Sequence, residues 1–229
     1  MEGVTVPLAL QDYMTVIFSA LGLAILTRMV YQLNRELGRL ALAGTALIVL
    51  GGFLKASGKL VSAAGGPDVA LLHQGLFPLI APGFALMAWS LYHIRRVFRD
   101  QPPLPRPWLT PAIVIAVVGV GATALALAGG PWKVPLILLA TVGNVGMLVM
   151  LALAAWGRKM WFTGSLFVVT LLVVLVMSQL ANMKDVSIGM IWFEQITQTI
   201  AQMLFALAAW NYSQKVEATY ARPLAAQTA

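Results

Sequence analysis

Five ionisable side chains lie within stretches of the sequence that are otherwise apolar. They are Asp12, Lys55, Lys59, His73 and Glu194. A charged group in hydrocarbon costs free energy, so such residues usually face the inside of a helix bundle and mark a functional site. At a rise of about 1.5 Å per residue, all five fall within about 12 Å of the predicted outer ends of their helices. They therefore indicate a polar site in the outer half of a membrane.

Helical spacing groups these side chains further. Lys55 and Lys59 are four residues apart, so they share one face of a helix. Glu194, Gln198 and Gln202 repeat at the same interval and form a polar stripe that descends about 12 Å towards the membrane centre. We expect Lys55 to face Glu194 across a pocket.

Amide and hydroxyl side chains on two other predicted helices extend this polar region. They are Thr141, Asn144, Ser178, Gln179 and Asn182. Lipid offers them no hydrogen-bond partner, so they should turn inward. Together with Asp12 and His73, the amides Asn144 and Gln179 then complete a ligand- or ion-binding pocket that opens to the outside. The alternative is a buried ion pair with interhelical hydrogen bonds, in which Lys59 reaches the headgroups and His73 lies at a helix cap or the interface.

Metal and cofactor chemistry finds little support in the residue types. The chain has no cysteine, which disfavours iron–sulfur and most zinc sites. His93 lies twenty residues after His73 on the same predicted helix, about 30 Å away, so the two cannot share one metal or haem. The seventh predicted helix has no lysine for a retinal Schiff base. The sequence thus predicts no metal site and leaves any cofactor unknown.

The elements that position these residues follow from composition. Of the 229 residues, 60% are apolar and only 10% are charged, which excludes an ordinary water-soluble domain. Seven apolar stretches are long enough to cross a bilayer. They cover about residues 7–29, 40–63, 69–92, 109–129, 134–156, 162–183 and 188–212. We therefore expect an all-α, polytopic seven-transmembrane bundle forming a single domain over 1–229, with a frayed cytoplasmic tail at 213–229.

Loop charges predict the orientation of this bundle. Positively charged residues concentrate in the loops on the cytoplasmic side of a membrane. One alternate set of loops holds Arg28, Arg35, Arg39, Arg95, Arg96, Arg99, Arg106, Arg158, Lys159, Lys215 and Arg222, and the other holds only Lys133 and Lys184. We expect the N-terminus outside, in a retained helix, and the C-terminus in the cytoplasm. This bias also accounts for the net charge of +7 without a nucleic-acid partner.

Prolines and glycines predict local features of the helices. Pro78 and Pro82 lie inside the third stretch, where they should cause a kink or local unwinding. Glycines that suit close helix crossings are Gly51, Gly52, Gly58, Gly119, Gly121, Gly143 and Gly146. The fourth stretch carries almost no polar side chain beyond threonine, so we expect it at the periphery or at an oligomer contact.

Three classes of function fit these observations. The first is a receptor-like or accessory module that binds a small polar or anionic ligand in the outward pocket and needs a membrane or cytoplasmic protein partner. The second is a transporter or channel for a small solute or for ions, coupled to protons. The third, least favoured, is an intramembrane enzyme with Glu194 or His73 as general acid–base. In each case we expect a multi-pass protein of the bacterial cytoplasmic (inner) membrane, in contact with the lipid bilayer.

Overall fold

The computed structural model of the protein describes residues 5–67, 69–102, 104–180 and 188–221. This part of the chain is helical, and it contains no strand. The helices are α1 (Val6–Leu33), α2 (Arg35–Ala63), α3 (Ala70–Gln74), α4 (Leu76–Val97), α5 (Leu109–Leu127), α6 (Lys133–Gly157), α7 (Trp161–Leu180) and α8 (Ile188–Val216), followed by a π-helical turn, η1 (Glu217–Ala221). The all-α prediction is confirmed for these residues.

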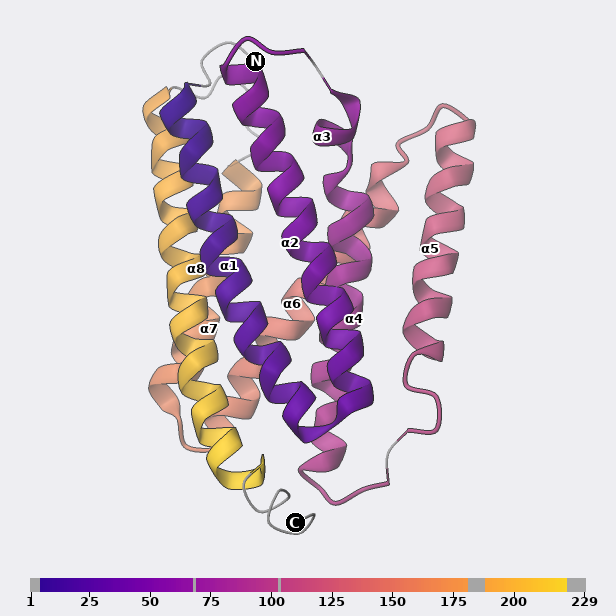
Figure 1. Ribbon diagram of the computed structural model, residues 1–229, viewed down its shortest axis with the longest axis vertical. Helices are drawn as coiled ribbons and strands as arrows, with labels where there is room; N and C mark the ends of the chain where they lie inside the picture. The colour runs from indigo at the N-terminus through magenta and orange to yellow at the C-terminus, as the bar shows by residue number, and fades with distance from the viewer. Residues whose placement is uncertain (1–4, 68, 103, 181–187, 222–229) are drawn as a thin grey trace.

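Six of the long helices form a closed ring. Each packs on two neighbours in the order α1, α2, α4, α6, α7, α8 and back to α1. They run up and down along one axis, so α1 begins at one end of the bundle and α8 finishes at the other (Figure 1). We call the end where α1 begins the N-side and the opposite end the C-side.

Several helices have the length and composition of membrane spans. Helices α1, α2, α5 and α6, and the segment formed by α3 and α4, are long and apolar enough to cross a bilayer. Helix α7 is apolar over Trp161–Met177. These are the helices of a multi-pass membrane protein. A long helix also lies at each of the seven predicted stretches.

The last helix continues beyond its predicted end. We expected a frayed tail from residue 213, but α8 extends to Val216 and η1 follows it. Ser213 and Val216 are buried, and the ring of Tyr220 lies 4.7 Å from that of Phe98. Packing against the bundle therefore stabilises a segment whose composition alone predicts fraying.

The third predicted span is interrupted, but not at its prolines. The break lies at Gly75, between α3 and α4, and α4 continues through Pro82. Pro78 occupies the first turn of α4, where a backbone N–H would have no helical partner in any case, so proline is tolerated there. The prediction of an interruption in this span is confirmed, although the break lies at Gly75, and a kink at the two prolines stays a prediction.

Glycines allow a close backbone contact between α2 and α4. A Cβ atom on Gly44 would lie 2.7 Å from the carbonyl oxygen of Gly83, and one on Gly83 would lie 2.9 Å from the carbonyl oxygen of Gly44. Cβ atoms on Gly51 and Gly143 would likewise lie 2.8–2.9 Å from atoms of α4. The predicted close crossings are thus confirmed at Gly51 and Gly143.

Helix α5 lies outside the ring. It contacts α6 and α4 only along part of its surface and stands apart in Figure 1. Leu127 is 86% exposed, and a Cβ atom on Gly119 or Gly121 would meet nothing within 4 Å. The expected close crossings are therefore wrong at these two glycines, as at Gly146, while the predicted peripheral position of this helix is confirmed.

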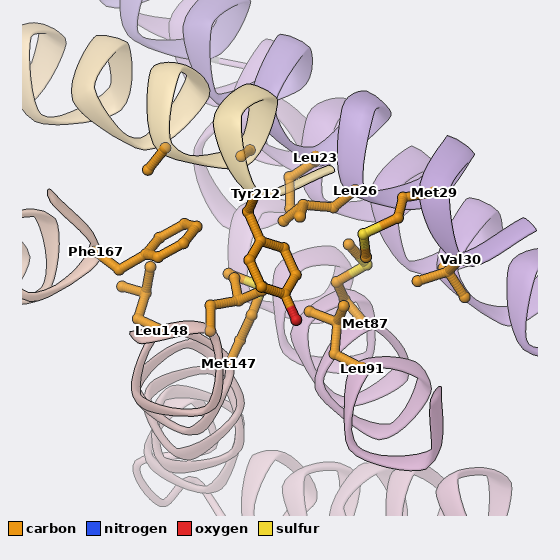
Figure 2. Close-up of a cluster of buried hydrophobic side chains, with 14 of the residues drawn as sticks. Leu23, Leu26, Met29, Val30, Met87, Leu91, Met147, Leu148, Phe167 and Tyr212 are labelled. Atoms are coloured by element: carbon orange, nitrogen blue, oxygen red, sulfur yellow. The ribbon is translucent and has the colours of Figure 1, made fainter. Parts of the chain in front are cut away.

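The interior of the ring is packed with apolar side chains towards the C-side. Figure 2 shows side chains from α1, α4, α6 and α7 converging around the ring of Tyr212 on α8. We call eight of these buried residues the C-side core: Leu23, Ile48, Met87, Met147, Leu151, Phe167, Phe205 and Tyr212. Each is at most 6% exposed, so this half of the ring is closed.

Candidate functional site

Polar side chains replace the C-side core on the N-side half of the same helix faces. On α2, Lys55 follows Ile48 by seven residues, which is two turns, so both point into the ring. On α6, Asn144 precedes Leu151 by the same interval. The interior of the ring therefore changes from apolar to polar along its axis.

Helices α1 and α8 follow the same pattern over three turns. Asp12 lies eleven residues before Leu23 on α1, and Glu194 lies eleven residues before Phe205 on α8. Gln198 lies between Glu194 and Phe205 on α8, two turns before Phe205. We call Asp12, Lys55, Lys59, Asn144, Glu194 and Gln198 the N-side polar cluster.

Lys55 has unusual surroundings for an inward-facing side chain. It is exposed, whereas Ile48 on the same face is only 6% exposed. The surrounding protein desolvates its ammonium group, and the charges of Lys59, Asp12 and Glu194 also act on that group. The structure thus brings three of the predicted site residues, Lys55, Asp12 and Glu194, within electrostatic reach of one another.

The ion pair in this cluster joins Lys59 to Asp12. Lys59 Nζ lies 2.5 Å from Asp12 Oδ2, and the two side chains are 26% and 12% exposed. No ion pair joins Lys55 to Glu194, although both side chains are described. Helix α1 packs between α2 and α8, so the acid on α1 is the nearest partner for a lysine of α2. The expectation that Lys55 faces Glu194 across a pocket stays a prediction, and Lys59 and Asp12 form a partly buried ion pair of the kind that the alternative described.

Helix α8 uses its polar residues in two ways. On the inward face, Gln198 Nε2 donates to Glu194 Oε1 at 3.1 Å. On the face towards α1, the Thr199 hydroxyl lies 2.7 Å from that of Thr15 and accepts a hydrogen bond from Gln11. Gln202, one turn beyond Gln198, is half-buried. The alternative of interhelical hydrogen bonds thus describes the α1–α8 contact, whereas Glu194 and Gln198 bond within their own helix.

Two predicted site residues lie beyond what the structure describes in full. His73 belongs to α3 and Gln179 to α7, but their side chains are outside the described part of the chain, as is that of Ser178. Asn182 falls in the undescribed segment 181–187. Within the described residues, no three His, Asp or Glu side chains gather as ligands for a metal ion.

Sequence reasoning missed a cationic pocket at the C-side. Arg158 follows α6 directly, and its guanidinium carbon lies 4.4 Å from the ring centre of Phe98 and 5.6 Å from that of Tyr212. These residues, with Arg95 and others, line a cavity of about 480 Å³. The arginines contributed only to the predicted orientation, since nothing in their local sequence places the ends of α4, α6 and α8 together.

The buried position of His93 is a second feature that sequence reasoning did not predict. Its ring is buried between Trp89 and Tyr92, with ring centres 4.1 and 4.9 Å away. Neither imidazole nitrogen has a hydrogen-bond partner among the described residues. The aromatic contacts with Trp89 and Tyr92 hold the imidazole in place.

Comparison with known proteins does not assign the chain to a family. No family model, curated protein or solved structure matches the chain.

Proposed function

We propose that the N-side polar cluster lines a water-accessible chamber that binds a small polar ligand, with an anionic group of the ligand at Lys55. The observation that carries this proposal is that Lys55 points into the ring and is nevertheless exposed. Lys55 forms no ion pair with a described residue, and an ammonium group without a close anion needs water or a ligand anion, because an unpaired charge in an apolar interior is costly. Glu194 and Gln198 supply further polar contacts near it.

The proposal includes an orientation. We propose that all seven long helices cross the membrane, with the C-side in the cytoplasm, because the described arginines of the loops gather there. The chamber then opens to the outside and is closed below by the C-side core. A binding site with a closed floor suits a sensing or accessory module, which holds its ligand without passing it on.

Cysteine accessibility tests the chamber directly. The natural chain has no cysteine, so a single introduced cysteine is its only thiol. We expect Lys55→Cys to react from the N-side with a membrane-impermeant maleimide, and Ile48→Cys, on the same face two turns deeper, to stay unreacted. Glu194→Cys provides a second reporter from another helix. Protection of both Lys55→Cys and Glu194→Cys in the folded protein would show that the cluster is packed and would refute the chamber.

A second candidate function is transport, and one observation favours it. The cationic pocket at the C-side includes Leu151 and Tyr212 of the C-side core, so polar sites approach the apolar core from both ends of the ring. A solute would cross if the core opened. Purified protein in liposomes separates the two functions: solute or proton flux that Glu194→Gln abolishes indicates transport, and binding without flux indicates sensing.

A further inference from the structure

The cationic pocket at the C-side has an unbalanced charge. Arg95, Arg99 and Arg158 line it, and no acidic residue among those described does so. The described ion pairs lie elsewhere, between Arg39 and Glu36 and between Lys59 and Asp12. Arg95 belongs to the last turn of α4 and Arg99 to the turn that follows the helix, and both line the pocket. Three guanidinium groups around one cavity attract an anion.

Arg158 is held in position before any ligand binds. Its guanidinium stacks on Phe98, and Nη1 donates to the carbonyl oxygen of Ala154 at 3.1 Å. A guanidinium has five N–H donors, so others remain for a ligand. A planar, fixed guanidinium suits the oxygens of a phosphate group, which it can bind through two parallel hydrogen bonds.

The rest of the pocket is apolar and reaches the outer surface of the bundle. Leu153 lines the cavity and is 54% exposed. It belongs to an exposed stripe of α6 with Leu138, Val142 and Val149. On a membrane helix such an exposed apolar stripe faces the lipid chains. The cavity is therefore cationic at its C-side end and continuous with the lipid-facing surface along α6.

We propose that this pocket binds an anionic phospholipid, with the phosphate at Arg95, Arg99 and Arg158 and an acyl chain along α6. A free phosphate would use the guanidinium groups but leave the apolar wall uncovered, whereas a phospholipid matches both parts. Basic pockets between membrane helices near the membrane surface are known to take such headgroups. The site is separate from the N-side polar cluster and does not depend on its function.

Native mass spectrometry of the full-length protein in detergent tests the proposal. Titration with phosphatidylglycerol should give one tightly bound lipid, and phosphatidylcholine should bind at least about tenfold more weakly. The Arg95→Gln/Arg99→Gln variant should lose about tenfold or more in affinity for phosphatidylglycerol. Arg28→Gln/Arg35→Gln is the matched control, because it removes the same charge from exposed positions at the same end and should bind as the natural protein does.

Three results would overturn the proposal. Equal weakening by the control variant would mean that the basic end attracts anionic lipid without a site. Equal affinity for phosphatidylcholine would remove the role of charge. Displacement of phosphatidylglycerol by millimolar inorganic phosphate would identify a free-phosphate site instead. If the Arg95→Gln/Arg99→Gln variant does not fold, the lipid and phosphate comparisons on the natural protein still decide the outcome.

Discussion

On the inward face of α2, Ile48 and Lys55 lie two turns apart and differ in exposure, in charge and in the residues around them. Ile48 packs in the C-side core, whereas Lys55 is exposed and surrounded by other charges. The same contrast recurs on α1, between Leu23 and Asp12, and on α8, between Phe205 and Glu194. Because the helices and their faces are the same, only side-chain chemistry distinguishes the two halves of the ring.

This contrast separates stability from function. In the C-side half, close packing of apolar side chains is what holds the helices together, since the hydrophobic effect is weak between lipid and protein. In the N-side half, polar and charged groups pack less completely and cost free energy unless water, a partner or a ligand reaches them. The stability cost is therefore concentrated in the half where we propose the binding chamber.

The largest effect on the free energy of unfolding is expected for a fully buried side chain of the C-side core. Phe167→Ala removes a ring that is fully buried against Phe205 and Tyr212. It should lower the free energy of unfolding by about 2–3 kcal/mol, less than in a soluble core because lipid replaces water as the alternative environment. Val174→Ala, two turns along the same face and half-buried, should cost under about 1 kcal/mol. Unfolding in mixed micelles measures both, and equal losses would mean that the two halves are packed alike.

A smaller effect is expected for the ion pair of the N-side half. Asp12→Asn should destabilise the protein by about 1–2 kcal/mol, because it leaves the Lys59 ammonium without its partner in a partly buried site. Adding Lys59→Met should restore much of this loss. The coupling energy from the same unfolding assay should exceed that of the Lys55→Met/Glu194→Gln cycle, since no ion pair joins those residues. A larger coupling between Lys55 and Glu194 would contradict the observed pairing.

The smallest effect on stability is expected from the loss of a single interhelical hydrogen bond, and each half of the ring offers one. Thr27 and Thr45 lie 2.8 Å apart on the C-side, and Thr15 and Thr199 lie 2.7 Å apart on the N-side. Thr27→Val should cost about 0.6 kcal/mol, a typical value for such bonds in membrane proteins. Thr15→Val should cost less, because water that reaches the N-side can take the place of the lost hydroxyl. A greater cost for Thr15→Val would argue that water is excluded there.

Much of the site could be predicted from the chain, and the part that could not has a clear cause. Helical spacing and depth correctly assigned Asp12, Lys55 and Glu194 to one half of the bundle, because both depend only on the regular geometry of a helix. The ion pair could not be predicted in this way. Whether Lys59 meets Asp12 or Lys55 meets Glu194 depends on which helices are neighbours, and the ring order places α1 between α2 and α8.

By itself, the sequence determined that the chain is helical and apolar and that alternate loops between its helices are basic, since these properties follow from composition and local periodicity. Only the tertiary structure decided that six helices close into a ring, that α5 stays outside it and that Arg158 stacks on Phe98 at the end of α4. Such contacts join segments far apart in the chain. They depend on the fit of whole surfaces, here the glycines of α2 and α4, and not on any single stretch of residues.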